Sequence, residues 1–154
     1  MDPLNWQIRK AEAKMHLQDM NLRLQAAFNE VPTLEIYKTI QQLAGSKRKK
    51  LQLELMTVLH KFYGNLPLAQ VLIYEEAWSE AMALAERRNV EYAIVETVAD
   101  GVVQHHPDWV ARVSVKHAER LMIEANSKNY PIAAAWLKRA KAAYQQLGQI
   151  AEWN

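Results

Sequence analysis

Apolar residues recur at helical spacing along most of the chain, and the few prolines and glycines lie between the helical segments. The clearest stripe has apolar side chains at positions i, i+4, i+7, i+8 and i+11, which are those of Leu51, Leu55, Val58, Leu59 and Phe62. No segment alternates between apolar and polar residues for long enough to predict a β-strand. The pattern therefore predicts an all-α fold.

Capping residues place the first helix boundaries. The pair Asp2–Pro3 suits the N-cap and the first position of a long polar helix that reaches about Phe28. Thr33 suits the N-cap of a short helix, Gly45 suits its C-terminal end, and Ser46 suits the cap of the helix that follows. The first part of the chain is thus expected to hold one long helix and two shorter ones.

Prolines divide the rest of the chain. Pro67 predicts the start of a short helix, and two further helices are expected over residues 78–88 and 90–104. His106–Asp108 and Pro131 mark the starts of the last two segments, which have regular apolar spacing. Together the segments predict about eight helices joined by short turns.

Two windows, residues 68–85 and 118–140, resemble the helix–turn–helix of tetratricopeptide repeats. Each has an aromatic residue just after the turn, expected to wedge between helices, and an alanine three residues later that lets the backbones approach. The windows lie too far apart for tandem copies of a 34-residue repeat. We expect an array of antiparallel helix pairs, an α-solenoid of tetratricopeptide or HEAT type, with generic helix-pair packing as the alternative. The expected packing residues are Trp78, Ala81, Tyr130, Ala133 and Trp136.

A set of aromatic, alanine and charged residues also matches the pattern of a known family. It comprises residues 28–37, 66–81 and 127–140, together with Tyr144, Gly148 and Glu152–Trp153. This set resembles the C-terminal helical region of bacterial SWIM zinc-finger proteins, and the resemblance covers residues 22–153. Its motifs are packing motifs, so the resemblance bears on the fold first.

The resemblance implies an α-helical repeat domain that follows a zinc-binding module in a larger polypeptide. That module needs a Cys-x-Cys and Cys-x-His ligand set, and this chain contains no cysteine. Any zinc-dependent binding of the family is therefore expected to lie outside this chain. We expect residues 1–154 to form a single helical-repeat domain, divisible into sub-units 1–64 and 65–154, taken from a longer protein. No enzymatic activity follows from the resemblance.

Composition narrows the class of protein. The chain has 154 residues, of which 50% are hydrophobic and 23% are charged, as is usual for a globular domain. The absence of cysteine excludes disulfides, cysteine-ligated zinc and cysteine nucleophiles within the chain. No apolar run approaches the ~18 residues of a membrane span, and the N-terminus lacks a secretory hydrophobic region. A cytoplasmic location is the expectation.

The strongest charge feature is the run Lys47, Arg48, Lys49 and Lys50. Four cations at the start of a helix oppose the helix dipole, so their placement hints at a role in contacting phosphates or an acidic partner. No aromatic residue interleaves with the run, which argues against a base-stacking platform. The alternative is a solvated edge of a turn.

Candidate catalytic and metal-binding groups are sparse. Histidines and carboxylates gather near the start of the segment that Pro107 opens, but adjacent histidines diverge and rarely share a metal. Two serines have a histidine or a lysine three residues later, without the strained turn or oxyanion-hole glycines of a nucleophilic site. The residues concerned are Ser46, Lys49, Asp100, His105, His106, Asp108, Ser114 and His117. We expect no catalytic site, no bound metal and no cofactor.

Trp6 is the tryptophan most expected to be exposed, because the first helix lacks a strong apolar stripe. It is the candidate protein-binding aromatic residue, with packing at the end of the solenoid as the alternative. The sequence thus favours a non-catalytic helical-repeat scaffold that binds protein or neighbouring domains of its parent chain. The alternative is an accessory nucleic-acid contact through residues 47–50.

Overall fold

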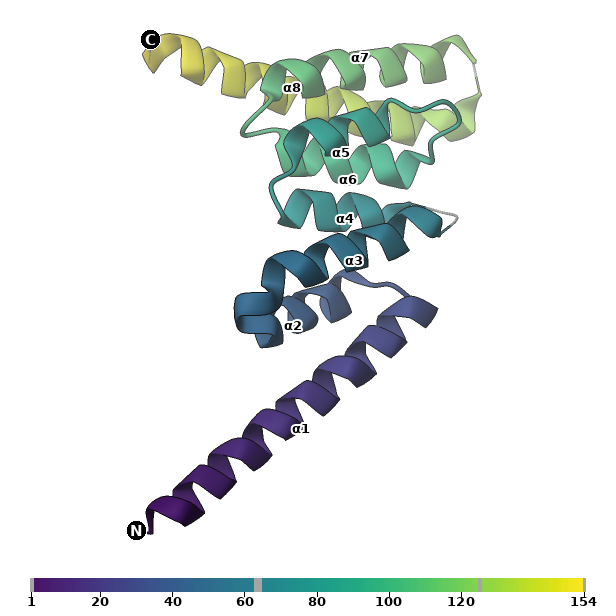
Figure 1. Ribbon diagram of the computed structural model, residues 1–154. Coiled ribbons are helices and arrows are strands. Elements are labelled where there is room, and N and C mark those ends of the chain that lie inside the picture. Colours follow the sequence, from purple (N-terminus) through teal and green to yellow (C-terminus); the bar gives the residue numbers. More distant parts are fainter. Residues whose placement is uncertain (1, 63–64, 125, 154) are drawn as a thin grey trace. The chain divides into compact units, whose positions relative to one another are not determined.

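The computed structural model describes the backbone of residues 2–62, 65–124 and 126–153, and side chains through residue 148. Within these residues the regular structure is entirely helical, with no strand, which confirms the predicted all-α class (Figure 1). The helices are α1 (Pro3–Glu30), α2 (Leu34–Ala44), α3 (Arg48–Lys61), α4 (Leu66–Tyr74), α5 (Trp78–Ala85), α6 (Tyr92–Val102), α7 (Pro107–Ile123) and α8 (Tyr130–Trp153). Among the described helices, none has both the length and the apolarity that crossing a membrane requires.

The chain forms two compact units, Met1–Val71 and Leu72–Asn154. The division falls within α4, so the first repeat-like window, residues 68–85, contains residues of both units. Unit 1 holds α1, α2 and α3, and unit 2 holds α5 to α8. The two units are described separately below.

Unit 1 is built on α2, which packs against α1 on one side and α3 on the other. Phe28, near the end of α1, is fully buried, and its ring lies 6.4 Å from that of Tyr37, centroid to centroid. Leu55 and Leu59 of α3 are also buried, as are Leu68, Ala69 and Val71 in the part of α4 that belongs to unit 1. The N-terminal part of α1 contributes nothing to this core, since Phe28 is the only buried residue of that helix.

The predicted caps of the first two helices are confirmed. Asp2 accepts a hydrogen bond from the backbone N–H of Leu4, and Thr33 accepts one from that of Ile36. The prediction for Ser46 is wrong, because a 3-10 turn (Gly45–Lys47) continues directly from α2 into α3. Ser46 therefore lies inside the turn, and the N-cap position of α3 has no side-chain hydrogen bond.

Unit 2 is dominated by α7 and α8, which pack along their lengths and run in opposite directions (Figure 1). This pair contains the second repeat-like window. On α8 the buried side chains recur every three or four residues and form one face against α7. They are Ala133, Trp136, Ala140 and Ala143.

The shorter helices of unit 2 also pack in chain order, α5 on α6 and α6 on α7. The helix predicted over 78–88 ends earlier, at Ala85, because the following turn includes Asn89 in the left-handed region, with φ of 57°. Gly101 allows the backbone of α6 to approach Ile73, near the end of α4, closely. A Cβ atom there would lie 2.7 Å from Cγ2 of Ile73, nearer than side chains approach one another.

The expected packing residues divide into three groups. Trp136, Ala81 and Ala133 are buried, as predicted. Trp78 is half-buried, and its ring stacks on that of His105 with centroids 4.5 Å apart. Tyr130 is 56% exposed, so the prediction that it wedges between helices is wrong. At 100° per residue it lies about a quarter of a turn away from the buried face of α8.

Candidate functional site

The four cations of the basic run lie at the junction between the 3-10 turn and α3. Lys47 ends the turn, and Arg48, Lys49 and Lys50 form the first turn of α3. All four side chains are exposed. The guanidinium Nε of Arg48 donates a hydrogen bond to Oε1 of Gln41, 3.1 Å away, which holds this side chain against α2.

A groove lies beside this junction, between α1 and the start of α3, with a volume of about 660 Å³. Residues at the end of α2 and in the 3-10 turn also line it, so three helices and the 3-10 turn of unit 1 shape the groove. Its lining residues are Lys14, Leu17, Gln18, Asn21, Leu22, Gln25, Leu43, Ala44, Ser46, Lys47, Lys50, Leu51 and Glu54. Lys47 and Lys50 thus belong to the groove, whereas Arg48 and Lys49 do not line it.

The lining combines apolar surface with positive charge. Its apolar side chains come from all three helices, with Leu17 on α1, Leu43 on α2 and Leu51 on α3. Three lysines accompany them against a single carboxylate, that of Glu54. An apolar groove bordered by cations suits a ligand that has an apolar face and negative charge beside it.

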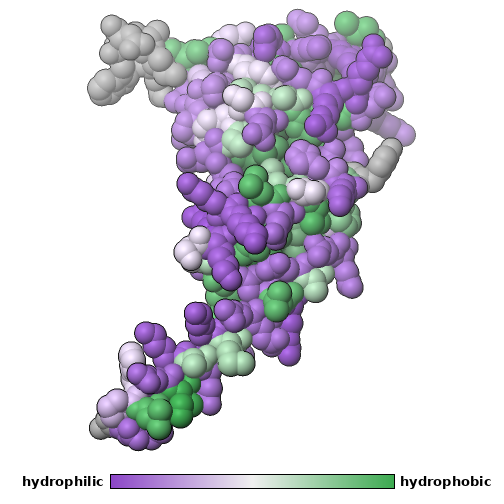
Figure 2. Space-filling view, in the orientation of Figure 1, coloured by the Kyte–Doolittle hydropathy of each residue, from purple (hydrophilic) through white to green (hydrophobic). Residues whose placement is uncertain are grey.

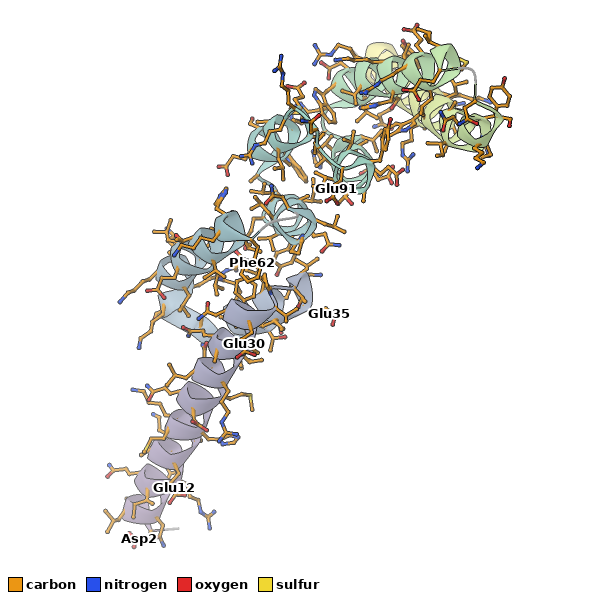
Figure 3. All side chains as sticks on the ribbon, turned by 90° about the vertical axis from the view of Figure 1, so that its right-hand side faces the viewer. Asp2, Glu12, Glu30, Glu35, Phe62 and Glu91 are labelled. Carbon is orange, nitrogen blue, oxygen red and sulfur yellow. The ribbon has the colours of Figure 1, made fainter. Side chains whose placement is uncertain are left out.

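The N-terminal part of α1 exposes large apolar side chains to solvent (Figures 2 and 3). Trp6 is 54% exposed, in agreement with the expectation, and the ammonium of Lys10 lies 5.0 Å from its ring centroid. The exposure of the other large apolar residues of this helix was not predicted. Its signal in the sequence is the number of large aliphatic residues within a helix that is otherwise polar.

Two of the histidines in and near α7 have aromatic packing partners. In the described parts of the chain, no three His, Cys, Asp or Glu side chains lie where they could share a metal ion. His105 instead stacks on Trp78, and His117 stacks on Trp136 with ring centroids 4.9 Å apart. These two histidines therefore have structural packing contacts in unit 2.

His117 lies in a partly buried environment on α7. Burial lowers its pKa, and the nearby cations Lys116 and Arg120 lower it further, so the neutral imidazole is favoured. Its Nδ1 atom is buried without a hydrogen-bond partner, as are Oγ of Ser114 and Nε1 of Trp136. A serine–histidine nucleophile pair requires a hydrogen bond between the two side chains. Ser114 makes no such bond to His117.

An ion pair links α8 to α6. Arg139 donates to both carboxylate oxygens of Asp100, at 2.9 and 3.3 Å, and its guanidinium carbon lies 4.8 Å from the ring centroid of Trp136. The hydrogen bond to Asp100 raises the pKa of Arg139, which stays charged. The arrangement fixes the position of Arg139 beside the buried tryptophan.

No family model matches the sequence, and the searches of curated proteins and of solved structures found no match either.

Proposed function

We propose that this chain is a non-catalytic helical-repeat module that binds an acidic, amphipathic helical segment of protein in the groove of unit 1. The groove is the observation that carries the proposal. The bound segment belongs to another protein or to a neighbouring domain of the parent chain.

The chemistry of the groove selects this class of ligand. An amphipathic helix presents its apolar residues every three or four positions and can place them against Leu17, Leu43 and Leu51. Acidic residues beside that apolar face would lie near Lys47 and Lys50. Such exposed charge pairs contribute mainly to specificity and to the rate of association, while the apolar contacts supply most of the affinity.

The resemblance to SWIM zinc-finger proteins supports the same role. It implies a helical repeat domain attached to a zinc-binding module, and helical repeats commonly serve as extended binding surfaces. The antiparallel packing of α7 on α8 is in keeping with this architecture.

The second candidate is a nucleic-acid contact through Lys47, Arg48, Lys49 and Lys50. The four consecutive exposed cations favour it. The groove lining, however, includes no aromatic side chain on which a base could stack. Four phosphate contacts alone also give weak binding at physiological ionic strength.

Fluorescence anisotropy with labelled probes separates the two candidates. The protein probe is a synthetic helical peptide with leucines on one face and glutamates elsewhere, and its control is a peptide of the same composition in scrambled order. The nucleic-acid probes are a single-stranded and a double-stranded oligonucleotide. At ~150 mM salt we expect the full chain to bind the patterned peptide more tightly than the scrambled peptide or either oligonucleotide.

Two pairs of variants locate the binding. Lys47→Gln/Lys50→Gln removes cations from the groove, and Lys116→Gln/Lys138→Gln removes two exposed cations from unit 2. The first pair should weaken peptide binding by about threefold to tenfold, because two exposed charge pairs are lost, and the second should leave it unchanged. For the apolar contacts, Leu17→Gln should weaken binding, whereas Leu53→Gln, exposed on α3 outside the groove, should not.

Equal binding of the patterned and scrambled peptides would refute the helix-in-groove proposal. Tighter binding of an oligonucleotide, lost in the Lys47→Gln/Lys50→Gln variant, would replace it with the nucleic-acid candidate. A peptide affinity that is insensitive to both Leu17 and the groove lysines would place the binding surface elsewhere.

A further inference from the structure

One side of α1 carries residues at alternating intervals of four and three, the spacing of a coiled-coil seam. The residues are Leu4, Ile8, Ala11, Met15, Gln18 and Leu22, and they are called the outer seam below. Five of the six are apolar. At 100° per residue all six lie within a narrow sector of the helix.

The outer seam is exposed along its length, and only Gln18 and Leu22 at its C-terminal end border the groove of unit 1. Leu4 is 61% exposed, Met15 is 68% exposed and Leu22 is 65% exposed, and α1 buries only Phe28. The side chains of this part of α1 radiate into solvent around the helix, as the region near Glu12 shows (Figure 3). A helix draws most of its stability from the packing of an apolar face, so an uncovered seam of this length calls for a partner helix.

The heptad positions follow from the spacing. Ile8, Met15 and Leu22 occupy a positions, and the other three members of the outer seam occupy d positions. The flanking g position before Met15 is then Lys14, and the e position one residue after Gln18 is Asp19. In a coiled coil these flanking positions decide which partner is chosen and in which orientation.

The flanking charges are complementary to a parallel copy of the same helix. In a parallel pair, a g residue faces the e residue five positions later on the partner, so Lys14 faces Asp19 of the second copy. Asp19 also pairs with Arg23 of its own helix at 3.2 Å, and its side chain is exposed enough to face the partner as well. The two-fold symmetry makes this contact twice. An antiparallel pair instead places e beside e and g beside g, which brings acidic residues together, since Glu12 also occupies an e position.

A second stripe of α1 does not share this complementarity. It runs through Trp6, Lys10, Ala13, Leu17, Met20 and Leu24, and a lysine occupies its seam. A parallel copy would bring Arg9 against Lys14, which repel. Toward its C-terminal end this stripe becomes partly covered, since Leu17 lines the groove and Leu24 is half-buried.

We infer that α1 pairs with α1 of a second copy of this chain as a parallel two-stranded coiled coil through the outer seam. An isoleucine at an a position with a leucine at the preceding d position favours two strands, as Ile8 and Leu4 provide. Gln18, a polar residue within the seam, lowers the stability of the pair. The dimer is therefore weak and forms as concentration rises.

Sedimentation equilibrium of the full chain at several concentrations tests the pairing by a charge exchange. Lys14→Glu creates two acidic contacts in its homodimer, and Asp19→Lys creates two basic contacts. Each variant alone should dimerise about fivefold more weakly than the natural chain, because two attractive pairs become repulsive. An equimolar mixture should recover the dimer, since both contacts of the mixed pair are again between opposite charges.

The apolar seam is tested by two matched double variants on opposite sides of α1. Ile8→Gln/Met15→Gln alters the outer seam, and Trp6→Gln/Met20→Gln alters the second stripe, at residues that are also exposed. The first should weaken dimerisation by about tenfold or more through the loss of buried apolar surface, and the second should have little effect. Circular dichroism on the same samples verifies that the folded units are retained.

Recovery of the dimer in the mixture, together with its loss in the outer-seam variant, establishes the pairing. A monomer at every concentration overturns it, as does a dimer that Trp6→Gln/Met20→Gln abolishes and the outer-seam variant does not. Weaker dimerisation of both Lys14→Glu and Asp19→Lys, with no recovery of the dimer in their mixture, also overturns the parallel register. Lys14, Gln18 and Leu22 line the groove as well, so the two surfaces overlap at this end of the outer seam. The peptide test changes Leu17, Lys47 and Lys50, and the seam test changes Ile8 and Met15, which do not line the groove, so either proposal can fail alone.

Discussion

The two longest helices of the chain, α1 with 28 residues and α8 with 24, use their apolar residues in different ways. On α8 the buried residues fall on one face, and α7 covers that face along its length. On α1 the apolar residues divide between two sides, and the N-terminal part of the helix has neither side buried. Trp136 on α8 is fully buried, whereas Trp6 on α1 is 54% exposed.

This difference separates stability from binding. Apolar surface that is covered inside a unit stabilises that unit, because it is removed from water on folding. Apolar surface left exposed on a helix is available for association instead. The buried faces of α7 and α8 therefore belong to the core of unit 2, and we propose that α1 with its groove serves recognition.

The largest expected contrast is between the two tryptophans. Trp136→Ala should lower the free energy of unfolding of unit 2 by ~3–5 kcal/mol, because it leaves a cavity between α7 and α8. Trp6→Ala should change stability by less than about 0.5 kcal/mol, because the side chain is exposed. Denaturant unfolding of the full chain measures both. A loss below about 1 kcal/mol for Trp136→Ala would mean that this side chain does not anchor the core.

Removing the N-cap side chain should lower stability at α2 but not at α1, although both helices are capped by the same type of hydrogen bond. Thr33 caps α2, which packs on both neighbours in unit 1, so Thr33→Ala should cost about 1 kcal/mol of unfolding free energy. Asp2 caps the exposed end of α1, so Asp2→Ala should fray that end with little effect on the unfolding of unit 1. Denaturant midpoints and amide exchange near residue 4 distinguish these effects. Equal losses of unfolding free energy would show that the end of α1 is coupled to the core.

The smallest predicted effect is a pH dependence of unit 2. Burial and two nearby cations lower the pKa of His117 in the folded chain, so the unfolded state binds the proton more readily. The stability that neutral His117 contributes is fully present above its pKa in the unfolded chain, about 6.5. This stability is lost as the pH falls through the lower pKa of His117 in the folded chain. His117→Gln should flatten this part of the stability profile. A stability that rises on acidification through the same range would contradict the assignment.

Local patterns predicted the fold class and most helix starts. The caps Asp2 and Thr33 and the start of α7 at Pro107 depend on neighbouring residues alone, which is why the sequence sufficed. Ser46 was assigned wrongly because its capping chemistry is equally compatible with a 3-10 turn. Tyr130 was assigned wrongly because an aromatic residue near a turn does not show which face the helix buries.

The candidate site was only partly visible in the sequence. Lys47 and Lys50 stood out as part of a charge run. Lys14 and Leu17 did not, because the groove forms between segments of α1 and α3 that are far apart in the chain. Such a surface depends on how α1 packs on α2, which no local pattern specifies.

Amide hydrogen exchange of the full chain, free and saturated with the patterned acidic peptide, tests whether the groove of unit 1 binds the peptide. With the peptide bound, we expect slower exchange in residues 14–25 of α1 and in residues 44–54 around the start of α3, where the groove lies. Residues 107–148, which contain the packed faces of α7 and α8, should exchange at unchanged rates. Protection confined to α7 and α8, with the groove segments unaffected in the bound state, would contradict binding in the groove.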